Sequence, residues 1–154
     1  MKITLLGCGT SVGVPSLGIL GWGKCNPNNP KNRRQRSSVL IQDNGYNILI
    51  DAGPDVRNQL LNANVDKIDA VLITHTHSDH ISGLPDLRPF FFAERKNIPI
   101  FGQIDSLNEI KEGQLNFFNF NLEVFIQHHG NINTLGFKFN NKFAYSTDVV
   151  KMPD

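Results

Sequence analysis

The feature that most constrains the fold is a short apolar run that leads directly into a cluster of histidines and an aspartate. The run is AVLI at residues 70–73, and the cluster is THTHSDH at residues 74–80. A continuous apolar run of this length favours a strand that is buried on both faces of a sheet. The chain has five histidines and three of them stand in this cluster, so we expect the strand to end in a functional site.

The spacing within the cluster indicates a metal site. His75 and His77 are two residues apart, and in an extended segment such side chains point to the same face. Asp79 and His80 follow where the chain begins to turn, and they can address a second metal nearby. Nitrogen ligands with carboxylates suit zinc and neighbouring borderline ions. A solvated turn is the alternative, and the buried strand before it argues against that.

Further ligands would have to come from distant parts of the sequence. His129 and Asp148 each follow a predicted strand, so they could meet the cluster at one rim, where a carboxylate such as Asp148 can bridge two cations. His129 could instead be a surface histidine, and Asp148 a turn residue. We expect His128, on the opposite face, to be structural. Asp51 either orients a metal-bound histidine or caps its loop, and the sequence leaves both open.

The rest of the chain predicts an α/β fold in one domain, residues 1–154, a length typical of a single domain. Asn44-Gly45 and Asn140-Asn141 indicate hairpin turns. A helix is expected from Pro54, with Val56, Leu60 and Leu61 as its apolar stripe. The pattern Ser106-x-x-Glu109 resembles a capping box and predicts a helix to about Phe117. Strands are expected over 2–6, 38–41, 47–50, 98–101, 122–126, 135–139 and 142–146, with another helix over 84–96.

Composition excludes several classes of function. Fifteen Lys and Arg against fourteen Asp and Glu leave a net charge of +1, which argues against a protein that coats nucleic acid or anionic lipid. No apolar run approaches the roughly 20 residues that span a bilayer, so no membrane partner is expected. The chain has two cysteines and no recognisable export signal, and we therefore expect a cytoplasmic location.

Residues 7–36 contain two motifs that could bind an anion. The glycines at 7, 9 and 13 do not have dinucleotide-binding spacing, so no nucleotide cofactor is expected, although their amides could line an anionic site. The basic run KNRRQR at 31–36 could hold a substrate phosphate or form a solvated loop. For any single arginine we prefer the solvated loop. Residues 16–36 are predicted to form a long surface excursion.

Taken together, these motifs resemble the metallo-β-lactamase-fold hydrolases. Residues 74–80 are similar to the His-x-His-x-Asp-His signature of that family. Residues 7–15, 32–38 and 49–55 resemble the branch of phosphoribosyl 1,2-cyclic phosphate phosphodiesterase-like proteins, whose relatives include transfer-RNA 3′-processing nucleases. Residues 127–130 (QHHG) and 145–148 (YSTD) are similar to the later ligand motifs. The resemblance covers essentially the whole chain in family order.

The resemblance implies a four-layer αββα sandwich, of which the C-terminal part is missing here, together with the last histidine ligand of the second metal. It implies that His75, His77 and His129 hold one of two divalent metals, and that a hydroxide between the metals is the nucleophile. Asp79, His80 and Asp148 would hold the other metal, with Asp148 bridging and Asp79 orienting the nucleophile as the catalytic residue. Zinc is preferred, with manganese or iron as alternatives. The branch often has a cysteine-rich zinc site; only Cys25 remains in that region, so no structural zinc is expected.

Two functions are compatible with this resemblance. The first is a metal-dependent phosphodiesterase acting on a small molecule of the cyclic ribose phosphate type, active as a homodimer or with a complementing C-terminal chain. A transfer-RNA 3′-processing type of endonuclease is its variant, against which the near-neutral charge argues. The second is a catalytically inactive, truncated remnant that keeps the metal-binding signature.

Overall fold

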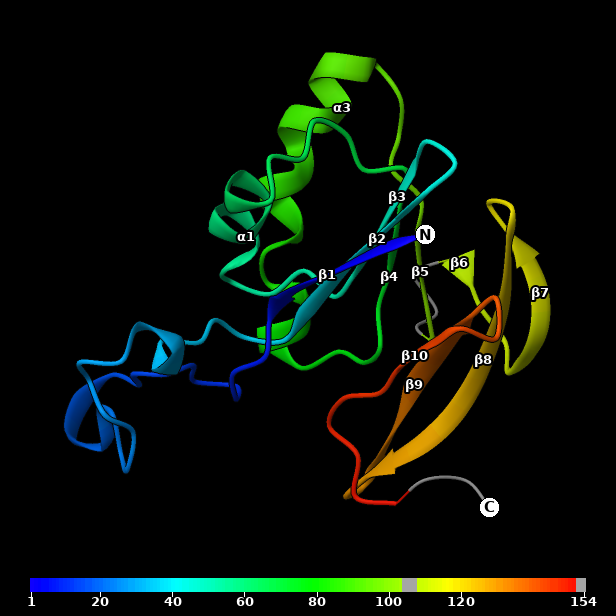
Figure 1. Cartoon of the computed structure of the whole chain (residues 1–154). Coiled ribbons are helices and arrows are strands. Elements are labelled where there is room, and N and C mark those ends of the chain that lie inside the picture. The colour runs from blue at the N-terminus through cyan, green and yellow to red at the C-terminus, as the bar shows by residue number, and fades with distance from the viewer. Residues whose placement is uncertain (104–107, 152–154) are drawn as a thin grey trace.

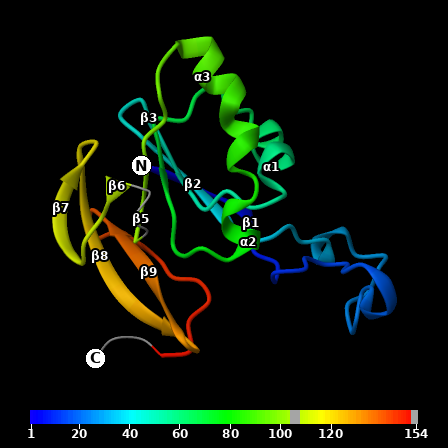
Figure 2. The same cartoon turned by 180° about the vertical axis from the view of Figure 1, so that it is seen from behind.

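The fold is built on two β-sheets that pack face to face, with helices on the outer side of the first sheet (Figures 1 and 2). The computed structural model describes residues 1–103 and 108–151. The first sheet has the strand order β1-β2-β3-β4-β5-β6 and the second β10-β9-β8-β7. The first sheet contains β1 (Lys2–Gly7), β2 (Ser38–Asp43), β3 (Tyr46–Ile50), β4 (Ala70–Leu72), β5 (Ile100–Gly102) and β6 (Asn108–Glu109). The second contains β7 (Gly113–Phe117), β8 (Phe120–His129), β9 (Ile132–Phe139) and β10 (Phe143–Tyr145).

The central strands of the first sheet are buried on both faces, which confirms the expectation from the apolar runs. β3, β4, β5 and β6 are parallel neighbours, whereas β1, β2 and β3 are antiparallel. Alternate residues of β4 face opposite sides, so Ala70 and Leu72 join the core between the sheets while Val71 joins the core under the helices. The second sheet closes the first core with Leu122, Val124, Leu135, Phe137 and Phe139.

Two helices cover the outer face of the first sheet. α1 (Val56–Asn62) begins two residues after Pro54, later than predicted, and buries Val56 and Leu60. Leu61 is 62% exposed, so its place in the predicted apolar stripe was wrong, and Gln59 is buried instead. The predicted helix over 84–96 is a 3₁₀ turn (Leu84–Leu87) that continues into α3 (Arg88–Glu94). No helix among the described residues is long and apolar enough to cross a membrane.

The helix predicted over 106–117 was wrong, because that stretch contains β6 and β7. β7 pairs antiparallel with β8 through a turn at Phe118 and Asn119, both of which have positive φ. Leu115 and Phe117 thereby reach the core between the sheets, and this burial outweighs a local capping pattern. Ser106 itself lies outside the described residues.

Both asparagine turns are confirmed as hairpins. Asn44 and Gly45 join β2 to β3 with φ of 49° and 81°, the left-handed backbone that a type I′ turn requires. Asn140 and Asn141 join β9 to β10 in the same way, with φ of 51° and 53°. The expected excursion is also present, since most of the segment between β1 and β2 extends away from the sheets (Figures 1 and 2).

The two sheets meet where the segment after β4 lies beside the middle of β9. The backbone N–H of Leu135 donates to the carbonyl of Thr74, 2.9 Å away, where β10 no longer flanks β9. The segment after β4 therefore lies beside the second sheet, and the residues at this end come from both sheets.

Candidate metal centre

The structure brings together side chains that are widely separated in sequence. His75 and His77 lie on the segment that follows β4, and the short helix α2 (Ser78–Ile81) carries Asp79 and His80. His129 is the last residue of β8, and Asp148 lies on the segment after β10. All six residues that the sequence singled out as ligands lie at this one end of the two sheets.

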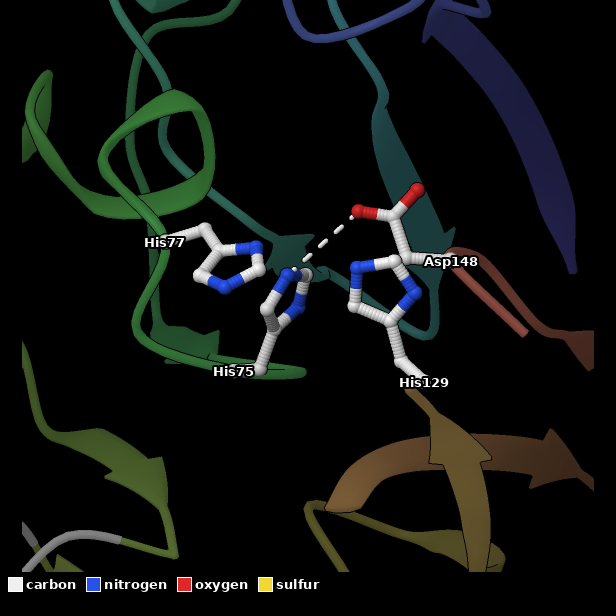
Figure 3. Close-up of side chains that lie close together, drawn as sticks. All are labelled: His75, His77, His129 and Asp148. Atoms are coloured by element: carbon white, nitrogen blue, oxygen red, sulfur yellow. Dashed lines mark ion pairs between the residues drawn. The ribbon is translucent and has the colours of Figure 1, made fainter. Parts of the chain in front are cut away.

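Four of these residues form a first group that could hold a metal ion. His75, His77, His129 and Asp148 each offer one ligand atom, and these atoms lie within 4.8 Å of one another. Their side chains point toward a common centre (Figure 3). The ring centroid of His77 is 4.5 Å from that of His75 and 5.4 Å from that of His129. Three imidazoles and a carboxylate are a ligand set typical of zinc.

A second group shares Asp148 with the first. Asp79, His80 and Asp148 also have ligand atoms within 4.8 Å of one another. The Nε2 atom of His80 is 2.9 Å from Asp148 Oδ2 and 3.3 Å from Asp79 Oδ2. The same Asp148 oxygen lies 3.3 Å from His75 Nε2. One carboxylate thus belongs to both groups.

The hydrogen bonds of Thr74 determine which nitrogen of His75 faces the centre. The Thr74 hydroxyl lies 2.9 Å from Asp51 Oδ2, and a carboxylate only accepts, so Thr74 donates its single proton there. The same hydroxyl, 3.0 Å from His75 Nδ1, must therefore accept from that nitrogen. Burial, with the neighbouring charge of His80, lowers the pKa of His75 to about 4, so the ring is neutral.

The consequence is an unsatisfied acceptor in the first group. With its proton on Nδ1, His75 presents a lone pair at Nε2, a buried atom with no hydrogen-bond partner. Asp148 Oδ2, another acceptor, faces it at 3.3 Å. A cation between or beside two acceptors at this distance would satisfy both of them. The residues therefore fit a divalent metal on structural grounds.

Asp51 is buried beneath the second group and orients His80. Its carboxylate accepts from the backbone N–H of Thr74 at 2.9 Å and from His80 Nδ1 at 2.8 Å. Burial raises the pKa of Asp51, while His80 and Thr74 oppose that rise. Burial also lowers the pKa of His80, but the hydrogen bond and charge of Asp51 outweigh it, so the pKa of His80 is raised. Of the two roles left open for Asp51, the geometry favours orientation of a histidine.

The helix α2 is held against the turn that follows β3 by close backbone contacts. The N–H of Ala52 donates to the carbonyl of His80 at 2.7 Å, and the N–H of Gly83 donates to Ala52 at 2.8 Å. A Cβ at Gly53 would overlap the backbone carbonyl of Asp79. The close approach leaves no room for a side chain at residue 53. Together with the hydrogen bonds of Ala52, it fixes the position of Asp79 and His80 relative to the first sheet.

The remaining predicted residues lie outside both groups. His128 is exposed, and its Nδ1 is 3.0 Å from Asn133 Oδ1. The arginines of the basic run already have partners. Arg36 pairs with Asp55 and donates to the carbonyl of Ser11. It therefore connects segments of the protein, a role that differs from the two expectations for the basic run, phosphate binding and a solvated loop. Arg34 contacts Cys8 Sγ, and Arg33 lies over the ring of Trp22.

Sequence reasoning missed two residues near the centre. Thr74 directs His75 through its hydroxyl, and its position between the buried strand and the first histidine was the available signal. Gln127 is fully buried on β8, two residues before His129, and no spacing rule points to it. Tyr145 is also buried nearby, and burial raises the pKa of its phenol, which therefore stays protonated.

The chain is similar to known proteins in both sequence and structure. Residues 46–128 match the family model described as beta-lactamase superfamily domain. A solved structure described as a new diphosphatase from the PhnP family has a TM-score of 0.90 and 32% identity, over 99% of this chain and 67% of that chain. An octanoyltransferase of Porphyromonas gingivalis is 41% identical over 113 residues, 73% of this chain. A ribonuclease Z of Mycolicibacterium gilvum is 29% identical over 141 residues, 87% of this chain.

The matches to these two relatives cover only part of each of them. The chain spans 22% of the octanoyltransferase and 43% of the ribonuclease Z. Both groups of candidate ligands lie within the residues that align in structure with the diphosphatase, since that superposition covers nearly the whole chain.

Proposed function

Because the chain belongs to the PhnP-like branch of the metallo-β-lactamase superfamily, we propose that it is a metal-dependent phosphodiesterase and that residues 1–154 act as one domain. The observation that carries this proposal is the position of Asp148, whose carboxylate is shared by two groups of ligands and faces the lone pair of His75. Paired divalent metals are suited to the hydrolysis of phosphodiesters.

The proposed ligand assignment follows the two groups. His75, His77 and His129 would hold one divalent metal, Asp79 and His80 would hold the other, and Asp148 would be a ligand shared by the two groups. Imidazole and carboxylate donors favour zinc, with manganese or iron as alternatives. Asp51 and Thr74 support this arrangement because they contact the Nδ1 atoms of His80 and His75, so that the Nε2 atom of each ring faces the candidate ligands.

In the proposed reaction, the metals and the protein side chains would have different roles. Bound divalent metals would lower the pKa of a water and neutralise charge on the phosphoryl oxygens. Asp79, whose oxygen lies 3.3 Å from His80 Nε2, would accept a hydrogen bond from that water and orient it. His77 is exposed, so the first group is open to solvent and to substrate on its side.

The substrate class rests on the relatives. The diphosphatase of the PhnP family and the family resemblance favour a small phosphodiester of the cyclic ribose phosphate type. The ribonuclease Z relative supports RNA as the alternative. Net charge favours the small molecule, because the chain carries only +1 while RNA binding draws on many basic contacts. Homodimerisation, or a complementing C-terminal chain, would supply further groups to the second metal.

The test is hydrolysis of bis(p-nitrophenyl) phosphate by the full chain. We expect turnover that is abolished by a chelator and restored by zinc or manganese, in wild type and in a His128→Ala control alike. A ribose cyclic phosphate and a transfer-RNA precursor, assayed in parallel, separate the two substrate classes. Folded protein that binds zinc but shows no metal-dependent turnover would contradict the proposal and support the inactive remnant.

His128 and His129, neighbours at the end of β8, allow a comparison of zinc content between two matched variants. His129→Ala removes a ring from the first group, so we expect the chain to lose about one equivalent of zinc and to stay folded. His128→Ala removes an exposed ring outside both groups, and zinc content should remain at the wild-type value. Metal analysis of both variants after dialysis is the measurement. Loss of zinc from His128→Ala, with retention in His129→Ala, would mean that the two residues are assigned the wrong way round.

Zinc binding should release a proton and weaken as the pH falls below the pKa of His80. The pKa of metal-free His80 is raised, so its ring holds a second proton to a higher pH than an ordinary imidazole does, and zinc must displace that proton from Nε2. His75, with a pKa of about 4, contributes no such proton near neutrality. One displaced proton weakens binding by about tenfold per pH unit below the pKa of His80. Calorimetry in buffers of different ionisation enthalpy counts the protons, and a buffer-independent binding heat would contradict the prediction.

The same two pKa shifts act in opposite directions on the stability of the metal-free fold. Because the pKa of His80 is raised on folding, His80 contributes to the free energy of unfolding at low pH. That contribution is lost as the pH rises through the pKa of His80 in the folded protein. Depressed pKa at His75 means that the fold loses stability as the pH falls below the ordinary value of 6.5 toward 4. At acidic pH the two histidines therefore make opposite contributions to the free energy of unfolding of the metal-free protein: His75 lowers it and His80 raises it.

A further inference from the structure

The side-chain amide of Gln127 makes three hydrogen bonds, one to β9 and two to the segment that follows β10. Its Nε2 atom donates to Thr134 Oγ1 on β9 at 3.0 Å and to the carbonyl of Thr147 at 2.7 Å. Its Oε1 atom accepts from the hydroxyl of Ser146 at 2.7 Å. Both donor hydrogens are used, and the amide is fully buried. Two of these three bonds reach the residues immediately before Asp148.

The segment that carries Asp148 has little burial of its own. Val150 is 76% exposed and Val149 is 39% exposed, so apolar packing cannot fix the position of the loop. Asp148 itself has φ of 49°, a left-handed conformation that needs support from its surroundings. Beyond Asp148, the N–H of Val150 donates to the carbonyl of His128 at 2.7 Å. Polar contacts with residues 127 and 128 of β8 therefore hold the loop on both sides of Asp148.

We propose that Gln127 is the positioning residue for Asp148, holding its carboxylate between the two groups of ligands. The proposal rests on the proposed function, because it takes Asp148 to be a ligand shared by two metals. Gln127 lies on the same face of β8 as His129, two residues away, so one strand supplies a ligand and also places a second ligand from another segment. Without this amide, Asp148 is free to move out of reach of His75 and His80.

A purely structural role for Gln127 predicts a different pattern of effects. A buried amide that only stabilises the sheet would lower stability when lost and leave metal affinity unchanged. Its bonds can be tested separately, because Thr134 belongs to the sheet while Ser146 belongs to the loop. Ser146→Ala removes one bond to the loop, Thr134→Val removes only the bond within the sheet, and Gln127→Leu removes all three.

The experiment is a zinc titration of the full chain against a chromophoric chelator, with urea unfolding of the metal-free protein as the companion measurement. We expect Gln127→Leu to weaken at least one zinc by about 10- to 100-fold, the usual cost of losing a group that orients a ligand. Ser146→Ala should weaken zinc in the same direction by a smaller factor. Thr134→Val should lower stability and keep both affinities within about twofold of wild type.

Two outcomes would overturn the inference. One is Gln127→Leu protein that folds and binds both zinc ions as wild type does. The other is Thr134→Val weakening zinc as much as Ser146→Ala does, which would mean that general stability and not the loop controls affinity. If Gln127→Leu does not fold, the comparison of Ser146→Ala with Thr134→Val decides alone. Wild-type protein that binds zinc without hydrolysing a phosphodiester would contradict the proposed function and leave this inference standing.

Discussion

Asp148→Ala should reduce metal-dependent hydrolysis by about 10³-fold or more, the largest effect that we expect from any single ligand. Asp148 is the one residue present in both groups, and its Oδ2 lies 2.9 Å from His80 Nε2 and 3.3 Å from His75 Nε2. Under the proposed assignment, its loss would remove an anionic ligand from both metals at once, and such metals supply several kcal/mol of charge stabilisation in the transition state. A 10³-fold loss corresponds to about 4 kcal/mol.

Two further variants sharpen this prediction. Asp148→Asn keeps the shape of the side chain and removes its charge, and we expect it to bind zinc more weakly than wild type and more tightly than Asp148→Ala. Asp66→Ala removes an exposed carboxylate from the loop before β4, and both zinc content and activity should be unchanged. Steady-state rates and metal analysis on the same preparations are the measurements. Asp148→Ala with full zinc content and full activity would refute a shared ligand.

Gly53→Ala should lower the free energy of unfolding by about 3 kcal/mol, at the upper end of what overpacking usually costs. A Cβ at this position would overlap the backbone carbonyl of Asp79, and a Cβ at Gly83 would overlap the carbonyl of Gly53. Neither clash can be relieved by rotating a side chain, because both involve backbone atoms. The helix α2 must therefore move away from the turn, and Asp79 and His80 move with it.

Urea unfolding and zinc titration together test this prediction. We expect Gly53→Ala to lose stability in the metal-free state and, in addition, to bind the second metal more weakly. Gly18→Ala is the control, since a Cβ there meets nothing within 4 Å and only the φ of 74° opposes it. About 1 kcal/mol is expected for that strain, without an effect on zinc. Equal losses of stability in the two variants would show that close packing at Gly53 is unimportant.

Much of the architecture follows from local sequence patterns. The apolar run at 70–73 was predicted to be buried on both faces, and β4 indeed contributes Leu72 to one core and Val71 to the other. The turns at Asn44-Gly45 and Asn140-Asn141 were predicted from residues that tolerate positive φ, and both occur. Such signals are reliable because they depend on neighbours in sequence, so that no distant contact has to be known.

The predictions that were wrong failed because they depend on contacts between residues far apart in the sequence. A capping pattern at 106–109 predicted a helix to Phe117, but pairing of β7 with β8 buries Phe117 in the core and packs Leu115 against it. Leu61 was assigned to the buried stripe of α1, yet the helix presents it to solvent and buries Gln59, whose amide donates to the carbonyl of Arg36. In each case a contact with a residue far away in sequence outweighed a local preference.

For the candidate site, the sequence alone predicted the candidate ligands of the pattern His75-x-His77-x-Asp79-His80. Their relative positions depend on the local geometry of a strand end and the turn that follows it. Which distant residues join them was decided by the tertiary structure. Only the meeting of β4 with β9 brings His129 to His75, and only the loop held by Gln127 places Asp148 between the two groups. The physical reason is that backbone conformation is a local property, whereas the distance between two ligands depends on how separate sheets pack.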